Sequence, residues 1–214
     1  MNASLSANPA GIRGIDVSHY QGTIDWNAVA KAGTVFTFIK ATEGTTGSDP
    51  NFEVNWNGSH TAGLLRGAYH FFQPGEDPRQ QAMNFLKVVQ PTPGDLPPVL
   101  DVEASGTPSE IIAGIHTWLT CVDLAVGKTP ILYTNPSFWA NLKTSDFGRF
   151  PLWIAEYGVV APKVPEGWSI WTFWQFSESG SIPGISGYVD FDLFQGTLPE
   201  LQGLAGMREV AGPA

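Results

Sequence analysis

Short β-branched and aromatic runs alternate with segments of helix or turn pattern along this 214-residue chain, and this alternation limits the possible folds more than any other property of the sequence. Such an alternation is typical of parallel βα units. Five of these runs occupy the first two thirds of the chain, at residues 14–17, 35–40, 65–72, 98–103 and 131–134. Stretches rich in Pro, Gly and Ser, rather than helices, separate three later runs at residues 152–155, 170–176 and 189–194. We therefore predict an α/β fold in a single domain, a modified TIM-type barrel of the (β/α)5(β)3 kind.

Three helices have recognisable starts. Residues 107–110, Thr-Pro-Ser-Glu, form a capping box pattern with proline at the first helical position, and apolar residues follow at helical spacing. Asp77-Pro78 and Asn135-Pro136 predict helices that reach about Val89 and Leu142. The only cysteine, Cys121, is predicted to be buried on the first of these helices, so the chain forms no internal disulfide.

Composition narrows the possible functions. A chain with 43% hydrophobic residues can close one sizeable core, so we expect a flexible segment at residues 1–10 and one domain at residues 11–214. The net charge of -9 disfavours nucleic acid and anionic membranes as partners, since both favour a basic surface. The start of the chain shows no signal-peptide pattern, and no stretch is predicted to span a bilayer. We expect a monomer.

Carboxylates are the candidate catalytic groups. Asp101 and Glu103 are two residues apart at the end of an apolar run, so both side chains should face the barrel interior, roughly 6 to 7 Å apart along the strand. That spacing suits two carboxyl groups acting on one glycosidic bond, although such a pair alone could equally flank a surface turn. Asp16 and Asp190 end the first strand and begin the last, which become neighbours in a closed barrel. Four converging acids would raise the pKa of the least stabilised one, as a general acid requires.

Eight segments, in order, resemble the strands of the glycoside hydrolase family 25 muramidases, the Chalaropsis-type lysozymes. The resemblance runs from Gly14 to about Gly196 and includes the catalytic strand Leu-Asp-Val-Glu at residues 100–103. The other matching segments are Gly-Ile-Asp-Val-Ser-His-Tyr-Gln-Gly at 14–22, Phe-Ile-Lys-Ala-Thr-Glu-Gly at 38–44, Gly-Ala-Tyr-His-Phe at 67–71, Leu-Tyr-Thr at 132–134, Leu-Trp-Ile-Ala at 152–155, Trp-Gln-Phe at 174–176 and Val-Asp-Phe-Asp at 189–192.

The resemblance implies a peptidoglycan hydrolase that cleaves the β-1,4 bond between N-acetylmuramic acid and N-acetylglucosamine with retention. It implies that Glu103 is the general acid/base and that Asp101 is either the nucleophile or the carboxylate that orients the substrate's acetamido group. Asp16 and Asp190 would support them. The resemblance implies no cofactor. The partner would be bacterial cell-wall peptidoglycan, and the protein would be extracellular or released to the cell wall.

Aromatic residues at predicted strand ends are candidates for sugar contact, because pyranose rings present flat apolar faces. Tyr69, Tyr133, Trp153, Tyr157 and Gln175 are predicted to bind substrate, with core packing as the alternative.

No metal site is predicted. His19 and His70 lie near strand ends without metal-ligand spacing, so we expect them to form hydrogen bonds within or beside the acid cluster. Lys40, at the end of the second strand, is expected to be solvated or paired with a carboxylate.

Two other functions are alternatives for a barrel with this pattern. A non-catalytic glycan-binding barrel would be expected to have lost some of the four acids, and all four are present. A retaining hydrolase of another N-acetylhexosamine polymer, such as chitin, is disfavoured because the chitinase-type DxxDxDxE strand is absent.

Overall fold

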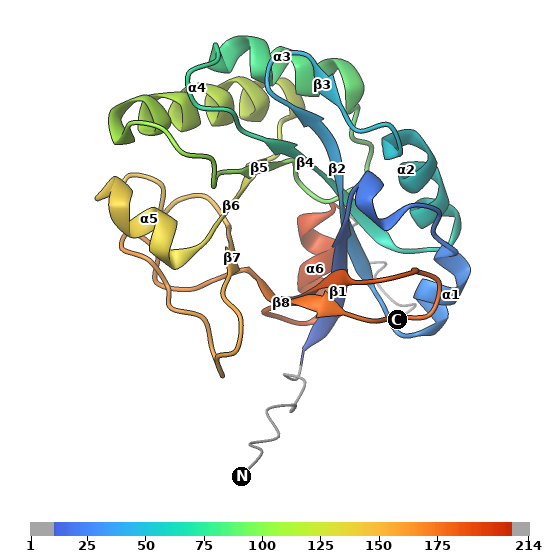
Figure 1. The fold of residues 1–214 in the computed structure, drawn as a ribbon. Coiled ribbons are helices and arrows are strands. Elements are labelled where there is room, and N and C mark those ends of the chain that lie inside the picture. Colours follow the sequence, from blue (N-terminus) through green and yellow to red (C-terminus); the bar gives the residue numbers. More distant parts are fainter. Residues whose placement is uncertain (1–10, 207–214) are drawn as a thin grey trace, which may run out of the picture.

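The computed structural model describes residues 11–206. Its strands close into a barrel with helices around it (Figure 1). β1 and β2 pair with each other and complete the ring. The strands around the barrel are, in spatial order, β1 (Ile12–Val17), β9 (Val189–Phe194), β8 (Phe173–Gly180), β7 (Leu152–Ala155), β6 (Ile131–Thr134), β5 (Val99–Asp101), β4 (Leu65–Phe71) and β2 (Phe36–Glu43). The two-residue strand β3 (Gly47–Ser48) pairs with the end of β2. The predicted barrel is confirmed, while the predicted flexible segment 1–10 lies outside the described residues.

Strand direction places the ends of β1 and β9 side by side. The neighbouring strands from β1 through β2 and β4 to β8 are parallel, whereas β9 runs antiparallel to both β8 and β1. The first residues of β9 therefore lie at the C-terminal end of β1, and Asp16 pairs with Asp190 in the register.

Helices cover the first five βα units, as predicted. They are α1 (Trp26–Lys31), α2 (Phe52–Thr61), α3 (Pro78–Val88), α4 (Pro108–Val126) and α5 (Pro136–Leu142), and a 3-10 turn, η1 (His19–Gln21), follows β1. A sixth helix, α6 (Leu198–Leu204), was not predicted. Its start carries a formed capping box between Thr197 and Glu200, with proline in the first turn.

Two sequence predictions about α4 were wrong, the side-chain cap at Thr107 and the full burial of Cys121. Thr107 makes no capping bond to the backbone; its hydroxyl instead donates to the carboxylate of Glu110 at 2.5 Å. With 19 residues and a mean hydropathy of 1.2, α4 is long and apolar enough to match a membrane span by length and composition alone. One face of α4 packs against α3 and the barrel through Ile115, Trp118 and Leu119, as the core helix of a globular domain does. Cys121, on the same helix, is half-buried rather than buried.

The hydrophobic core has two main parts that follow the alternation of each strand. One fills the barrel with inward side chains such as Phe36, Phe38 and Phe173. The other lies between strands and helices and contains the alternate residues, for example Ile15 and Ile39. Gly14 faces inward, where an added Cβ would lie 2.3 Å from the Phe36 ring. Apolar side chains thus fill the barrel interior, and polar inward residues at the C-terminal ends of the strands can form a site.

Candidate active site

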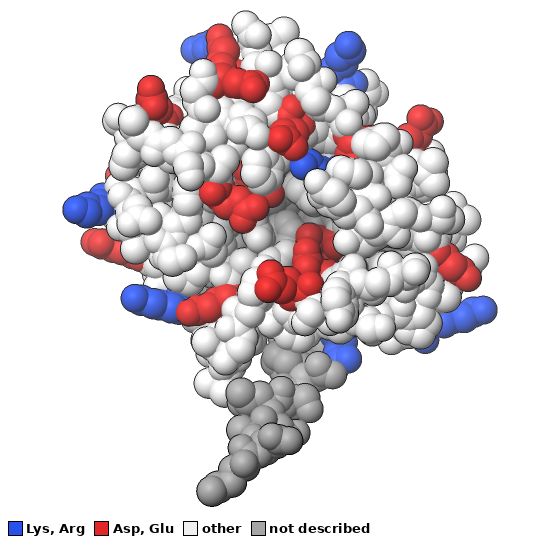
Figure 2. Space-filling view, in the orientation of Figure 1, with Lys and Arg blue, Asp and Glu red and all other residues white. Residues whose placement is uncertain are grey.

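The four predicted acids meet in one pocket of about 220 Å³ at the C-terminal end of the barrel. Asp16 comes from β1, Asp101 ends β5, Glu103 follows two residues later, and Asp190 begins the antiparallel β9. In the space-filling view, acidic side chains gather around a hollow near the centre of the face (Figure 2). The structure thus brings together all four residues, although they are separated by up to 174 positions in the sequence.

Asp101 and Glu103 share the inward side, with Val102 between them turned into the outer core. Asp101 is buried, and its Oδ1 atom has no hydrogen-bond partner among the described residues. Burial, together with the charges of Glu103 and Asp16, raises the pKa of Asp101 well above its usual value. Glu103 lies at the solvent-accessible mouth, where partial burial raises the pKa of its carboxyl and Lys40 opposes that rise.

Asp16 is held by a buried amide. Gln175 Nε2 donates to Asp16 Oδ2 at 2.7 Å, while Gln175 Oε1 accepts from the hydroxyls of Tyr133 at 2.9 Å and Tyr157 at 2.6 Å. Burial and the charge of Asp190 raise the pKa of Asp16 well above its usual value. Three of the residues predicted to bind sugar therefore form a network that reaches Asp16.

Trp153 lies below the pocket rather than on its surface. Its side chain is 2% exposed and packs at 4.5 Å between ring centroids against Phe38 inside the barrel. Its indole Nε1 donates to Asp192 Oδ1 at 2.9 Å. This placement matches the core-packing alternative. Of the five predicted substrate residues, Tyr69 is the one that lines the pocket together with the acids.

Asp190 and Asp192 are the acids of β9, and sequence reasoning missed the second one. Burial and the charge of Glu178 raise the pKa of Asp190 to about 6. Asp192 is completely buried, and burial followed by the charges of Asp16 and Asp190 raises its pKa well above the usual value. The two-residue spacing of these acids in a strand could have revealed that both face inward.

The pocket wall also contains Lys40 and five residues to which the sequence analysis gave no role. Lys40, which lines the pocket, donates to Glu43 Oε2 at 2.7 Å, so its predicted pairing with a carboxylate is confirmed. The unassigned residues are Val17, Ser18, Tyr20, Gln21 and Phe71. Most of them belong to the segment directly after β1, and their position at a strand end was the available signal.

The two histidines do not line the pocket that holds Asp16, Asp101, Glu103 and Asp190. His19 forms a hydrogen-bonded pair with Asp49, 2.7 Å from Nδ1 to Oδ2, beside the pocket. His70 points outward from β4 into the helix layer, where it stacks on Trp118, so the expectation of a place in or beside the acid cluster was wrong for His70. Within residues 11–206, no group of three or more His, Cys, Asp or Glu side chains is arranged to hold a metal ion.

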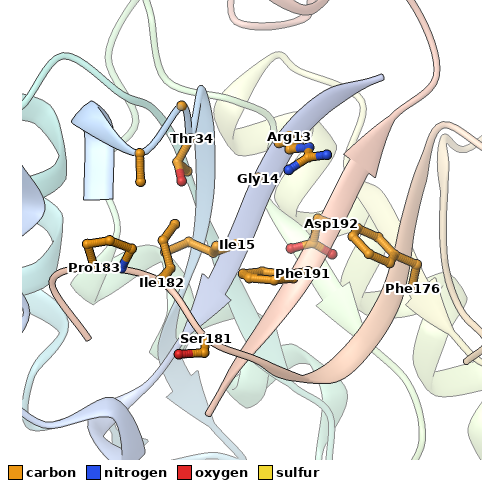
Figure 3. Close-up of a pocket in the computed structure, with 12 residues that line it drawn as sticks. Arg13, Gly14, Ile15, Thr34, Phe176, Ser181, Ile182, Pro183, Phe191 and Asp192 are labelled. Atoms are coloured by element: carbon orange, nitrogen blue, oxygen red, sulfur yellow. The ribbon is translucent and has the colours of Figure 1, made fainter. Parts of the chain in front are cut away.

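A second pocket of about 220 Å³ lies on the outer side of β1 and β9, against the loop at residues 181–183 (Figure 3). Its lining includes Ile15, Phe176 and Phe191, and it lacks Asp101, Glu103 and Asp190. The candidate active site is therefore the acid-lined pocket. It contains the accessible Glu103, whose carboxyl has a raised pKa, beside the buried Asp101, whose Oδ1 has no donor among the described residues. Such a pair can supply a proton to a leaving group and stabilise positive charge at the reacting carbon.

Comparison with known proteins agrees with this geometry. The profile of the family described as glycosyl hydrolases family 25 matches residues 15–185. The chain is 44% identical to the uncharacterized protein YegX of Escherichia coli (strain CFT073) over 92% of this chain and 75% of that protein. It is 37% identical to lysozyme M1 of Streptomyces globisporus, over 93% and 73% of the two chains.

A solved structure extends the likeness to the fold. The bacterial lysozyme from Streptomyces coelicolor superposes with a TM-score of 0.88 at 36% identity, covering 93% of this chain and 99% of that chain. The family profile spans most of the chain and includes the ends of β1 and β5, which carry Asp16, Asp101 and Glu103. The chain therefore belongs to family 25 of the glycosyl hydrolases.

Proposed function

We propose that this protein is a muramidase that hydrolyses the β-1,4 bond between N-acetylmuramic acid and N-acetylglucosamine in bacterial peptidoglycan, with retention. The observation that carries the proposal is the meeting of Glu103, Asp101, Asp16 and Asp190 in one pocket at the barrel mouth. Family membership and the lysozyme relatives support the substrate class. A glycan-binding barrel without turnover has no need for a glutamate with a raised pKa beside a buried aspartate.

Glu103 is proposed as the general acid and then the general base. Its raised pKa favours the protonated carboxyl that a general acid needs, and its place at the pocket mouth lets it reach the glycosidic oxygen. Protonation of that oxygen releases the leaving sugar as an alcohol while positive charge develops at the anomeric carbon. In the second step, water gives its proton to Glu103 and its hydroxyl to the anomeric carbon, and the bond between that carbon and the oxygen that captured it, from Asp101 or the acetamido group, breaks.

Asp101 is proposed as the partner that captures the positive centre. Either its carboxylate attacks the anomeric carbon, or it accepts a hydrogen bond from the substrate's acetamido N–H while the acetamido oxygen attacks. The buried Asp101 Oδ1 has no donor among the described residues, so an acceptor atom is available for the second role. Asp16 and Asp190 support the pair by fixing its electrostatic surroundings.

Substrate contact is proposed for Tyr69, on the pocket wall, and for Tyr157, whose side chain is 40% exposed. Tyr133, Gln175 and Trp153 are buried, and we assign them to holding the acids. We further propose that the protein acts as a monomer on the cell wall, outside the cytoplasm, with no nucleic-acid or membrane partner.

Mass spectrometry of fragments released from purified peptidoglycan tests the proposal. A muramidase leaves N-acetylmuramic acid at each new reducing end. New reducing ends of N-acetylglucosamine, or release of peptides without glycan cleavage, would contradict the assignment. Chitin serves as the control substrate and should release little, because it lacks the lactyl and peptide groups of the wall.

A further inference from the structure

One carboxyl oxygen of Asp192 is buried without a hydrogen-bond donor among the described residues. Its side chain is buried in the barrel below the pocket, and Oδ1 accepts the Trp153 indole N–H, whereas Oδ2 has no donor among the described residues. A buried carboxylate oxygen without a donor is costly. The cost disappears if that oxygen carries a proton, because it then becomes a donor and needs an acceptor instead.

Asp16 is the acceptor within reach. In the antiparallel pairing of β1 and β9, Asp16 lies opposite Asp190, and Asp192 lies opposite Gly14. Figure 3 shows Gly14 and Asp192 on the two neighbouring strands. Asp192 is thus the diagonal neighbour of Asp16 on the inward face. The carboxyl groups of the two residues are close enough to hydrogen-bond.

The other side of Asp16 is already fixed. Gln175 Nε2 donates to Asp16 Oδ2, and Gln175 Oε1 is occupied by two tyrosine hydroxyls, which sets the orientation of the amide. A second donor from Asp192 would hold Asp16 from below. The groups that face Asp192 are Asp16 from β1, Asp190 from β9 itself and the Trp153 indole from β7. Both titratable neighbours are acids, so no positive charge in this set favours an ionised Asp192.

We propose that Asp192 keeps its proton while the enzyme works and donates its O–H to Asp16, which makes Asp192 a positioning residue of the active site. The buried surroundings, which raise the pKa of Asp192 well above its usual value, agree with a retained proton. The role rests on the proposed function, because Asp16 matters only if the acid cluster is catalytic. The retained proton itself does not depend on activity.

Two substitutions separate the donor from the negative charge. Asp192→Asn keeps an N–H donor toward Asp16 and an oxygen toward Trp153, so kcat on peptidoglycan should stay within about threefold. Asp192→Leu removes the donor and should lower kcat by about 10 to 100-fold, the scale of a misplaced active-site group. If Asp192→Asn is as inactive as a folded Asp192→Leu, the negative charge is what matters and the proposal is overturned.

Proton release on unfolding gives a second readout. It requires no substrate and compares the unaltered protein with Asp192→Asn alone. At neutral pH, unfolding of the unaltered protein should release about one proton more than unfolding of Asp192→Asn, because Asp192 ionises once it is exposed. The slope of unfolding free energy against pH measures this count. Glu166→Gln, which likewise turns a carboxyl into an amide at an exposed position, is the matched control and should leave the count unchanged. Equal counts for the unaltered protein and Asp192→Asn would overturn the proposal, even if the protein cleaved no peptidoglycan.

Discussion

Asp190→Asn should make the protein more stable at neutral pH, because the acid cluster stores unfavourable charge. Asp190 lies partly buried at the pocket wall, beside Asp16 and near Glu178. Its pKa rises from 3.8 to about 6 in the folded protein, mainly through burial. This difference corresponds to about 3 kcal/mol of unfolding free energy, which is an upper bound because neighbouring acids titrate together with Asp190.

The direction of this stability change with pH depends on whether the folded or the unfolded state binds the proton more tightly. A carboxyl whose folded pKa is raised gives its full stabilisation below the unfolded pKa of about 4 and loses it as pH rises through about 6. Asparagine does not ionise and keeps the neutral form at every pH. The variant should therefore match the unaltered protein near pH 4 and exceed its unfolding free energy by about 2 to 3 kcal/mol at pH 7.

Urea unfolding at a series of pH values measures this difference. Glu166→Gln replaces an exposed carboxylate with an amide and should show no gap that opens with pH. An Asp190→Asn variant that is less stable than the unaltered protein at pH 7, or equally more stable at pH 4 and pH 7, would refute the charge argument.

Protonation of His70 should weaken the fold in acid. Burial is the main cause that lowers the pKa of His70 from 6.5 to about 4, so the unfolding free energy should fall by about 3 kcal/mol as pH falls from about 6.5 to about 4. In urea titrations, His70→Gln should lose less stability over this range, while the exposed control His60→Gln should behave like the unaltered protein. Gly114→Ala should destabilise α4 by about 1 to 3 kcal/mol, because the added Cβ would lie 2.4 Å from the Phe72 ring. Gly203→Ala, in α6 with open space at its Cβ, is the control in thermal unfolding, and a gain for Gly114→Ala would contradict the close contact.

The barrel could be predicted because each of its strands carries its own local pattern. Buried β-branched and aromatic runs, with proline-marked helix starts between the early ones, specify the βα order without knowledge of distant contacts. α6 was missed because its seven residues are short, although the Thr197 capping box was present in the sequence. The cap at Thr107 was predicted from the same pattern and did not form, because the two side chains bond to each other.

The sequence could predict which site residues lie at strand ends, but not how deep in the barrel each side chain lies. Inward alternation and the closing of the barrel bring Asp16, Asp101, Glu103 and Asp190 together. The depth of a side chain within the barrel is a tertiary property, so Trp153 could not be distinguished from a surface tryptophan by its place in the sequence. The same limit hid the bonds from Tyr133 and Tyr157 to Gln175, since these depend on how three strands or loops approach one another.

The division of labour between Glu103 and Asp101 is the central claim, and activated substrates test it most directly. Glu103→Gln removes the proton donor and should lower turnover on peptidoglycan by about 10² to 10⁴-fold, and Asp101→Asn should also cripple it. A glycoside with a phenolic leaving group needs little protonation, so it should partly restore turnover to Glu103→Gln and leave Asp101→Asn impaired. Restoration in the Asp101 variant alone would contradict the account, because the two roles would then be reversed.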